Sequence, residues 1–346
     1  MISLFVPEKL PETALCILLT HLENSRSSLL FQSLENNRID HLFGITSNPE
    51  EADFVLLPHD YRLVGVKKDY LNFVVGVAND HQKKILVIAY NDSSKEIDLP
   101  NAIILRTSKY KTTLKENEFI IPPIVDDLLS GSVVSVRHKS KKPVIGFVGW
   151  GAFSSLKQKL KIVSRGLAID AQAVFSFDKN IEARKPGLLF RRKAIKVLLP
   201  SEKVVANFVV RKTFSGNVKT IELDPALARK EYIKNTVNSD FILCSRGDGN
   251  YSMRFYEALS AGRVPVLIDT DLALPLENKI DYDNFVLRVP MSGIGSVDSI
   301  VADFYSKISD QEFTAMQLAA RQTFENHLNF ESFFRIIFEE VLPKQI

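Results

Sequence analysis

Short apolar runs rich in β-branched residues alternate along this chain with longer segments whose apolar positions recur at helical spacing. In the first third, the strand pattern covers residues 3–6, 54–58, 85–89, 103–106 and 119–121, and the helical pattern covers residues 12–22 and 62–81. Strands that alternate with helices are typical of parallel sheets covered by helices, so we predict the α/β class.

The same alternation resumes near residue 143. Predicted strands cover residues 143–148, 204–210, 241–244, 264–268 and 285–289, and predicted helices cover residues 154–165, 188–199, 225–238 and 252–261. Residues 311–342 have helical apolar faces throughout. We therefore expect an N-terminal Rossmann-like domain (1–125), a C-terminal one (143–310) and C-terminal helices (311–346) that can cross back to the first domain.

Residues 126–142 separate the two predicted domains and have the composition of a linker. Two aspartates and a Ser-Gly-Ser turn precede a basic run from Arg137 to Lys142. Because like charges repel one another and favour exposure, we interpret this run as a solvated tether. Contact with an anionic membrane surface or an anionic acceptor is the alternative.

Composition excludes several classes of protein. The 346 residues carry 44 basic and 41 acidic side chains, and the net charge of +3 is too small for a polybasic binder of nucleic acid. A hydrophobic content of 45% argues against disorder.

The cysteines and the N-terminus indicate the cellular compartment. Cys16 and Cys244 form no zinc or disulfide pattern, which indicates a reducing compartment. Because Pro7, Lys9 and Pro11 interrupt the apolar N-terminus, we expect neither a signal peptide nor a membrane span, and a cytoplasmic protein.

The most informative stretch follows the predicted strand that ends at Cys244. This strand runs into a glycine-rich turn, residues 245–252, which opens a helix. Such a turn directs backbone N–H groups and the positive end of the helix at one spot, which makes an anion site for phosphate or diphosphate. Arg246 and Arg254 would add charge-assisted hydrogen bonds to the phosphate oxygens.

Glu257 follows Arg254 by three residues, so the two side chains share a face of the predicted helix. A carboxylate at this place can accept two hydroxyl protons, as a ribose diol requires. The alternative is a surface salt bridge with Arg254, worth about 0.5 kcal/mol. Gly262 is expected to end the helix.

The run Ser245-Arg246-Gly247-Asp248-Gly249-Asn250-Tyr251-Ser252-Met253-Arg254-Phe255-Tyr256-Glu257-Ala258-Leu259-Ser260-Ala261-Gly262-Arg263-Val264-Pro265-Val266-Leu267-Ile268 closely resembles the exostosin-like (GT47) glycosyltransferases. The resemblance continues through residues 274–275 and 280–282, and extends more weakly to residues 142–149 and 52–58. It implies a GT-B fold: two facing Rossmann-like domains with a cleft between them, the donor on the C-terminal domain and the acceptor on the other.

The resemblance also implies an inverting transfer of a hexosyl, glycuronosyl or pentosyl group from a nucleotide sugar, with UDP-sugars the first choice, to a glycan or glycolipid in surface polysaccharide synthesis. No metal or other cofactor is expected. Eukaryotic members carry an N-terminal membrane anchor and this chain shows none, so we expect a bacterial-type enzyme, peripheral at the inner face of the membrane or in contact with other glycan-assembly enzymes. The residues expected to bind the donor are Gly149, Trp150, Arg246, Gly247, Asn250, Ser252, Met253, Arg254 and Glu257.

Three other interpretations of the same stretch stay open. Gly247-x-Gly249-x-x-Ser252, with Asp269 further on, is part of the fingerprint of an NAD-dependent Rossmann enzyme, but the third glycine is missing. Asp269-Thr270-Asp271 spells a DxD motif that can bind a divalent cation, or else caps a loop. A non-catalytic partner subunit that only binds the nucleotide sugar is the third.

The catalytic base is the least determined element. His59 and Asp60 follow the predicted strand 54–58, and open α/β sheets bind ligands at the carboxyl ends of strands. An imidazole there could take the proton of the acceptor hydroxyl. Asp60 could instead cap the helix that follows.

Overall fold

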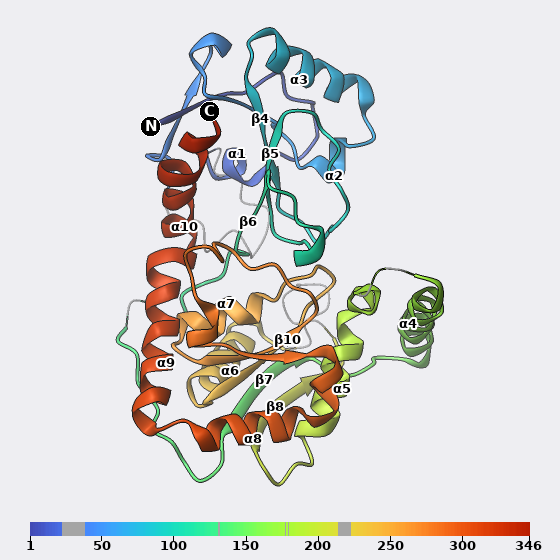
Figure 1. The fold of residues 1–346 in the computed structure, drawn as a ribbon, viewed down its shortest axis with the longest axis vertical. Coiled ribbons are helices and arrows are strands. Elements are labelled where there is room, and N and C mark those ends of the chain that lie inside the picture. The colour runs from blue at the N-terminus through green and yellow to red at the C-terminus, as the bar shows by residue number, and fades with distance from the viewer. Residues whose placement is uncertain (23–38, 131, 177, 179, 214–222) are drawn as a thin grey trace. The chain divides into compact units, whose positions relative to one another are not determined.

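The computed structural model describes residues 1–22, 39–130, 132–176, 178, 180–213 and 223–346. The chain divides into two compact units, and both use segments that are distant in sequence (Figure 1). Unit 1 comprises Met1–Val125, Ala273–Glu277 and Asn326–Ile346, and unit 2 comprises Asp126–Leu272 and Asn278–Glu325. Each contains one parallel sheet, so the predicted α/β class with two Rossmann-like sheets is confirmed.

Unit 1 contains a six-stranded sheet in the order β2-β1-β3-β4-β5-β6, in which all neighbours are parallel. The strands are β1 (Ile2–Phe5), β2 (Phe43–Thr46), β3 (Phe54–Leu56), β4 (Lys84–Ala89), β5 (Ala102–Arg106) and β6 (Glu118–Ile120). The helices are α1 (Ile17–Leu22), α2 (Tyr61–Val64) and α3 (Lys68–Asp80), with short 3-10 turns η2 (Pro49–Glu51) and η3 (Lys111–Thr113).

Successive residues of β3 and β4 enter different apolar cores on the two faces of this sheet. Phe54 and Leu56 belong to one core, whereas Val55 and Leu57 belong to the other. This follows from the two-residue period of a strand and explains why the central strands are continuous apolar runs without polar alternation.

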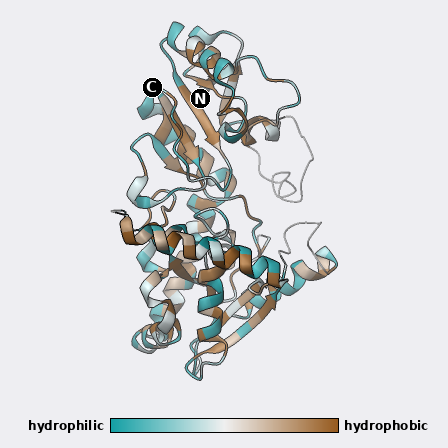
Figure 2. Ribbon diagram, turned by 90° about the vertical axis from the view of Figure 1, so that its right-hand side faces the viewer, coloured by the Kyte–Doolittle hydropathy of each residue, from teal (hydrophilic) through white to brown (hydrophobic). Residues whose placement is uncertain are grey.

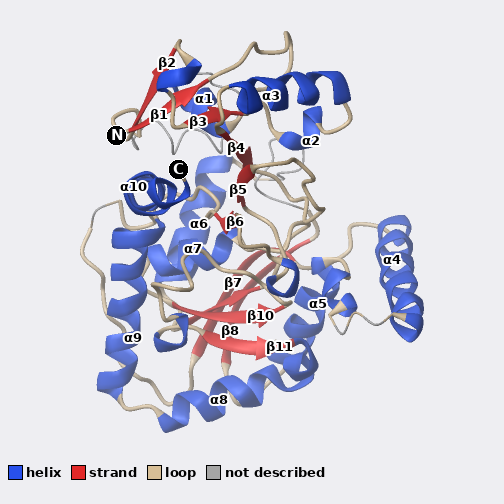
Figure 3. Ribbon diagram, turned by 45° about the horizontal axis from the view of Figure 1, so that its top comes forward, coloured by secondary structure: helices blue, strands red, loops and turns tan. Residues whose placement is uncertain are grey.

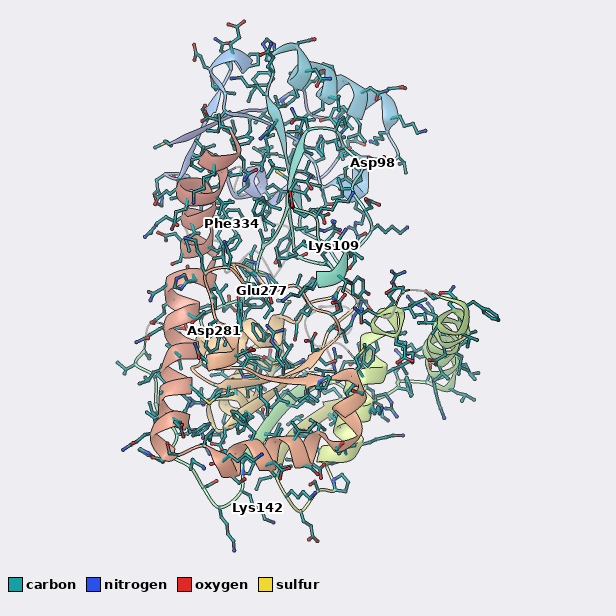
Figure 4. All side chains as sticks on the ribbon, viewed as in Figure 1. Asp98, Lys109, Lys142, Glu277, Asp281 and Phe334 are labelled. Carbon is teal, nitrogen blue, oxygen red and sulfur yellow. The ribbon has the colours of Figure 1, made fainter. Side chains whose placement is uncertain are left out.

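The C-terminus completes the first of these cores. It contains α10 (Phe330–Ile336), the π-helical turn η8 (Ile337–Val341) and the 3-10 turn η9 (Leu342–Gln345). Phe333, Phe334 and Phe338 join the cluster that contains Ile2 and Leu4, and Figure 4 labels Phe334 on this helix.

Unit 2 contains a five-stranded parallel sheet in the order β11-β10-β9-β7-β8. Its strands are β7 (Val144–Trp150), β8 (Val205–Arg211), β9 (Phe241–Cys244), β10 (Val264–Asp269) and β11 (Leu287–Pro290). Its helices are α4 (Leu156–Phe175), α5 (Gly187–Leu198), α6 (Pro225–Val237), α7 (Met253–Ser260), α8 (Val297–Lys307) and α9 (Asp310–Thr323). The short turns are η4 (Ile181–Arg184), η5 (Tyr282–Asn284), η6 (Met291–Ser296) and the π-helical η7 (Phe324–Leu328).

The strand order of unit 2 reverses at β7. The chain leaves β7 for β8 on one side and later returns to β9 on the other. Because crossovers are right-handed, this reversal places helices on opposite faces, with α6 and α7 on one and α5 and α8 on the other (Figure 3). Ligands of open parallel sheets bind outside the carboxyl ends of the strands at such a switch point, which here lies between β7 and β9.

The expected linker, residues 126–142, is counted with unit 2, apart from Gly131, which lies outside the described residues. Its basic run is not a free tether. Arg137 Nε lies 2.6 Å from Oδ1 of the fully buried Asp240, and Lys139 Nζ donates to the carbonyl oxygens of Tyr305 and Ile308. The solvated-tether interpretation was therefore wrong for these two side chains: Arg137 supplies the cation that the buried Asp240 carboxylate needs, and Lys139 is held by two backbone carbonyl oxygens. Lys142 is exposed at the turn before β7 (Figure 4).

Candidate functional site

β7 and β9 are neighbouring parallel strands, so the loops that follow their carboxyl ends lie side by side. Gly149 is close to the start of one loop and Arg246 is in the other, almost one hundred residues further along the chain. Gly149, near the end of β7, has a φ of +139°, a conformation that side chains rarely adopt. A Cβ atom at this position would lie 2.8 Å from Nη2 of Arg254. Glycine is therefore required at position 149, because the Arg254 guanidinium occupies the space beside it.

The loop 245–252 leads from β9 into α7. Gly247 N donates to Tyr251 O at 3.1 Å, and Ser252 is the N-cap residue of α7 without a side-chain cap bond. A Cβ atom at Gly247 would meet nothing within 4 Å among the described residues, so this loop borders open space. Met253 begins the helix, and the amides of its first turn carry the positive end of the helix dipole.

Asn250 has a positioning role in this loop. Its side chain is fully buried; Nδ2 donates to the carbonyl oxygens of Thr270 and Asp271 at 3.2 Å each, and Oδ1 accepts from Thr270 Oγ1 at 2.7 Å. These bonds tie the loop to the end of β10. Asn250, expected among the donor-binding residues, thus uses its side chain to hold loop 245–252 against the residues that follow β10.

Arg246 and Arg254 both lie at the switch point, in different surroundings. Arg246 is buried and donates to Ala183 O at 2.6 Å and to Asp248 O at 2.8 Å. Arg254 donates from Nη2 to Val148 O at 3.0 Å and lies 4.7 Å from the centre of the Phe147 ring. Its Nε is buried and has no hydrogen-bond partner within the described residues.

Arg191, on α5, is a third arginine at this place, which the sequence did not single out. It is 7% exposed, and its Nη1 and Nη2 donate to Trp150 O at 2.8 Å and Arg246 O at 2.9 Å. It thereby bridges the loops that follow β7 and β9. Burial and, to a smaller extent, the nearby Arg254 cation lower the pKa of Arg191 to about 9, and the Asp248 carboxylate acts in the opposite direction.

In the sequence, Arg191 is the first residue of a basic cluster, Arg191-Arg192-Lys193, and this cluster is a signal for positive charge on α5 that does not identify which side chain is buried. The close approach of α5 to loop 245–252 depends on Gly187, where a Cβ atom would lie 2.3 Å from Arg246 O. Within the described part of the chain, no carboxylate forms an ion pair with Arg191 or Arg254. Arg191 is buried and Arg254 is partly buried, and removing cations from water without a paired carboxylate is costly, so this arrangement is suited to an anionic ligand.

Glu257 lies on α7 with its carboxylate 13% exposed. Oε1 accepts from Arg229 Nη1 at 3.0 Å and Oε2 accepts from Tyr232 Oη at 2.6 Å. Burial raises the pKa of Tyr232 well above its usual value, and the Glu257 carboxylate adds to the effect. The surface salt bridge with Arg254 is not formed among the described contacts. Each carboxylate oxygen keeps a lone pair that can accept a further hydroxyl proton.

Trp150 is half-buried at the end of β7. Its indole Nε1 donates to Ala152 O at 2.9 Å, and its own carbonyl accepts from Arg191. These bonds fix the conformation of the loop that follows β7.

The prediction that Gly262 ends the helix after loop 245–252 is confirmed. Gly262 follows the C-cap residue of α7 and has a φ of +61°.

The two residues predicted as catalytic base lie in unit 1. His59 is fully buried; its Nε2 accepts from Leu10 N at 2.9 Å, and its Nδ1 lies 3.1 Å from Ala14 O. Burial lowers the pKa of His59, which favours the neutral imidazole. With both nitrogens engaged by the backbone, His59 has no free lone pair for the proton of an acceptor, and this geometry argues against the catalytic role.

Asp60 caps α2. Its Oδ1 accepts from Arg62 N at 2.8 Å, and both carboxylate oxygens accept from Asn91 Nδ2. The capping role that the sequence left open is therefore present. A carboxylate retains further acceptor capacity, so these bonds leave room for a second role.

The aspartates of the DxD motif serve the loop after β10. Asp269 Oδ1 accepts from Leu272 N at 3.2 Å, and Oδ2 lies 3.7 Å from Arg288 Nη1. The backbone carbonyl of Asp271 accepts from Asn250. The described residues contain no group of three side chains that could hold a metal ion.

The two units each contain a parallel sheet with helices, which defines a two-unit, Rossmann-like α/β protein, and three arginines lie at the switch point of unit 2. The comparison with protein families is more specific: the model of the exostosin GT47 domain matches residues 128–304, about half of the chain, and so the chain belongs to the exostosin GT47 family. This confirms the resemblance found in the sequence. Exostosin-1 of Drosophila melanogaster is 40% identical over 70 residues, which cover 18% of this chain and 9% of that protein.

Proposed function

We propose that this chain is an inverting glycosyltransferase that moves a hexosyl, glycuronosyl or pentosyl group from a nucleotide sugar, with UDP-sugars the first choice, to a glycan or glycolipid in surface polysaccharide synthesis. The observation that carries the proposal is the pair Arg191 and Arg254, for which the described residues provide no carboxylate partner, at the switch point of unit 2. The diphosphate of a nucleotide sugar supplies the negative charge that this place lacks.

In the proposed reaction, an acceptor hydroxyl oxygen attacks the anomeric carbon from the side opposite the diphosphate. The bond from that carbon to the phosphate oxygen breaks, its electron pair leaves with the diphosphate, and the hydroxyl proton passes to a base. Negative charge grows on the diphosphate as the bond breaks. Arg191, Arg246 and Arg254, with the first-turn amides of α7, would stabilise this charge where it develops.

Glu257 is the proposed ribose ligand. Arg229 and Tyr232 hold its carboxylate in place through one hydrogen bond to each oxygen. The remaining lone pairs can accept from the two ribose hydroxyls. Glu257→Gln removes the charge and part of this capacity, and we expect a KM for the donor about tenfold higher, which corresponds to about 1.4 kcal/mol.

The proposed reaction needs no metal ion, because the guanidinium groups supply the positive charge that a divalent cation provides in metal-dependent transferases. Transfer is expected to continue at its full rate in EDTA. If manganese were needed to restore the activity, the role of Asp269 and Asp271 would have to be reassigned to metal binding.

Of the residues predicted as base, Asp60 is the one we retain as the proposed proton acceptor, because its carboxylate can accept a proton while it caps α2.

The setting proposed for the reaction is a reducing one, the cytoplasm. The buried, free Cys16 and Cys244 are in keeping with this setting.

The decisive experiment measures the thermal stability of the full chain with UDP-, GDP-, CMP- and dTDP-sugars, followed by transfer assays with the nucleotide sugar that stabilises it. Ligands that bind the native state raise Tm by mass action. Arg254→Gln should abolish the stabilisation, whereas Lys196→Gln, which removes an exposed charge from α5, should preserve it. A nucleotide sugar that stabilises the protein but is neither transferred nor hydrolysed would support the non-catalytic binding subunit instead.

A further inference from the structure

Helix α4 carries an apolar row that faces solvent. Leu156, Leu160, Leu167 and Val174 are 70%, 62%, 61% and 76% exposed, and Phe175 at the end of the helix is 87% exposed. At 3.6 residues per turn, the four aliphatic positions fall within an arc of about 40°. They form one continuous strip along the helix, which is more than the scattered exposed apolar residues of an ordinary surface.

The fold of unit 2 does not use this strip. The face of α4 that packs contains the buried Ile162 and Gly166, and a Cβ atom at Gly166 would lie 2.6 Å from Leu189 Cδ1 on α5. Figures 1 and 3 both show α4 at the edge of unit 2, beside α5 and apart from the sheet. The inner face is therefore sufficient to hold the helix, and the outer strip is free for another surface.

The charges of α4 form a second pattern. Lys157, Lys159, Lys161 and Arg165 are exposed. At about 100° per residue, Lys157 and Lys159 lie roughly 80° to either side of the middle of the apolar strip, Lys161 lies roughly 120° from it, and Arg165 lies roughly 160° from it, on the opposite side of the helix. None of the four forms an ion pair with a described residue. The only acid of the helix, Asp170, is paired with Lys185 at 2.5 Å.

Neither pattern helps the helix itself. Like charges at four-residue spacing destabilise an isolated helix, and an exposed apolar strip favours aggregation. Both features have a common explanation if the helix meets a surface that is apolar beneath an anionic layer. In Figure 2, where the side that carries α4 faces the viewer, hydrophobic and hydrophilic turns alternate along the ribbon on this side.

We infer that α4 docks this protein on the surface of a bilayer rich in anionic lipid. The leucines, Val174 and Phe175 enter the boundary between headgroups and acyl chains, and Lys157 and Lys159 on either side of the strip, with Lys161 next to Lys157, contact the lipid phosphates. No helix within the described residues is long and apolar enough to cross a bilayer, so the contact is peripheral. A flat lipid surface fits a convex helix with cations on both sides of its apolar strip.

The test is co-sedimentation of the full chain with vesicles of phosphatidylcholine alone or with phosphatidylglycerol added, at low and high salt. We expect at least tenfold tighter binding to the anionic vesicles, weakened by salt. Leu160→Ser/Leu167→Ser and Lys157→Glu/Lys161→Glu should each reduce it at least tenfold. The matched controls, Leu199→Ser/Leu227→Ser for exposed leucines and Lys141→Glu/Lys142→Glu for exposed lysines elsewhere in unit 2, should bind like the wild type.

Far-UV circular dichroism and the UDP-induced rise in Tm should be unchanged in the α4 variants, which separates loss of docking from loss of fold. The inference does not depend on the transfer reaction, because vesicle binding is measured without any donor. Equal binding to neutral and anionic vesicles, or a loss of binding only in the Lys141/Lys142 variant, would overturn it. So would a wild-type protein that ignores vesicles and instead binds an acidic protein through α4.

Discussion

The direction of single arginine side chains decides the chemistry of unit 2. Arg191 and Arg192 are neighbours of the same type, yet Arg191 is buried at the switch point and Arg192 stacks over the Phe153 ring at 4.0 Å. Helical periodicity separates the two side chains by about 100°. Which of them points inward is decided by the position of α5 on the sheet, and this is why the sequence indicated a basic cluster but not the residue.

Arg191→Gln tests the value of the buried cation. We expect UDP to bind roughly 10- to 100-fold more weakly, because a hydrogen bond to a charged group contributes about 1.5–3 kcal/mol. The stability of the protein without UDP should change less, since the substitution also removes an uncompensated buried charge. Titration calorimetry with UDP measures the first effect and the melting temperature measures the second. Unchanged UDP affinity, with Lys196→Gln as the reference for loss of one charge from α5, would remove Arg191 from the site.

Asp60 has two roles that one substitution can separate. Asn is as good an N-cap as Asp, so Asp60→Asn should preserve α2, whereas Asp60→Ala loses the cap and about 1 kcal/mol of stability. If Asp60 is the base, Asp60→Asn lowers kcat by about 10²- to 10⁴-fold without a change in Tm. A fully active Asp60→Asn enzyme would show that the carboxylate is only a cap, and the base would have to be sought on another residue.

At the scale of elements, strands and turns with strong local signals were predictable. The strand that ends at Cys244, the turn that opens α7 and the glycine that ends it all occur where the sequence placed them. Two helical segments were predicted less well. The segment 62–81 is two helices, α2 and α3, with Gly65 as the C-cap of the first.

Helix α4, predicted over residues 154–165, continues to Phe175. Apolar residues on two faces of α4 hide the single amphipathic stripe by which a surface helix is normally recognised. The helix was thus hard to delimit from sequence for the same reason that makes it a candidate docking surface. In the candidate site, the positioning role of Asn250 was not predictable, because its hydrogen-bond partners Thr270 and Asp271 come from a later loop.

The contact between α5 and loop 245–252 gives a prediction about an element. Gly187→Ala places a methyl group where Arg246 O lies 2.3 Å away, so the start of α5 or the loop must shift. We expect a loss of about 1–3 kcal/mol of stability, as for other overpacked sites, together with weaker UDP binding. Gly76→Ala in α3 is the matched control: a Cβ atom there meets nothing within 4 Å among the described residues, and Ala should stabilise that helix by about 0.5–1 kcal/mol. Equal melting temperatures for the two variants would contradict the close packing of α5.

At the scale of the whole molecule, each unit takes segments from distant parts of the chain. Arg321 of α9 binds Asp127 through both of its Nη atoms and thereby fixes the start of unit 2 to one of its last helices. In unit 1, the aromatic residues of the C-terminus share a core with the first strand. The sequence predicted these helices from their periodicity, but periodicity cannot identify the sheet against which an apolar face packs.

Phe333→Ala tests how independent the two units are. Phe333 is fully buried in the core that it shares with Leu4 and Phe54. Its truncation should cost about 3–5 kcal/mol and destabilise unit 1. The arginines, the α7 start and Glu257 all belong to unit 2, so UDP should still protect unit 2 from unfolding.

Hydrogen exchange followed peptide by peptide, with and without UDP, distinguishes these effects, with Leu318→Ala on the exposed side of α9 as the control. Faster exchange in unit 1 together with retained UDP protection in unit 2 is the expected pattern. If Phe333→Ala abolished UDP protection, donor binding would require an intact core of unit 1, and the assignment of the donor site to unit 2 alone would be wrong.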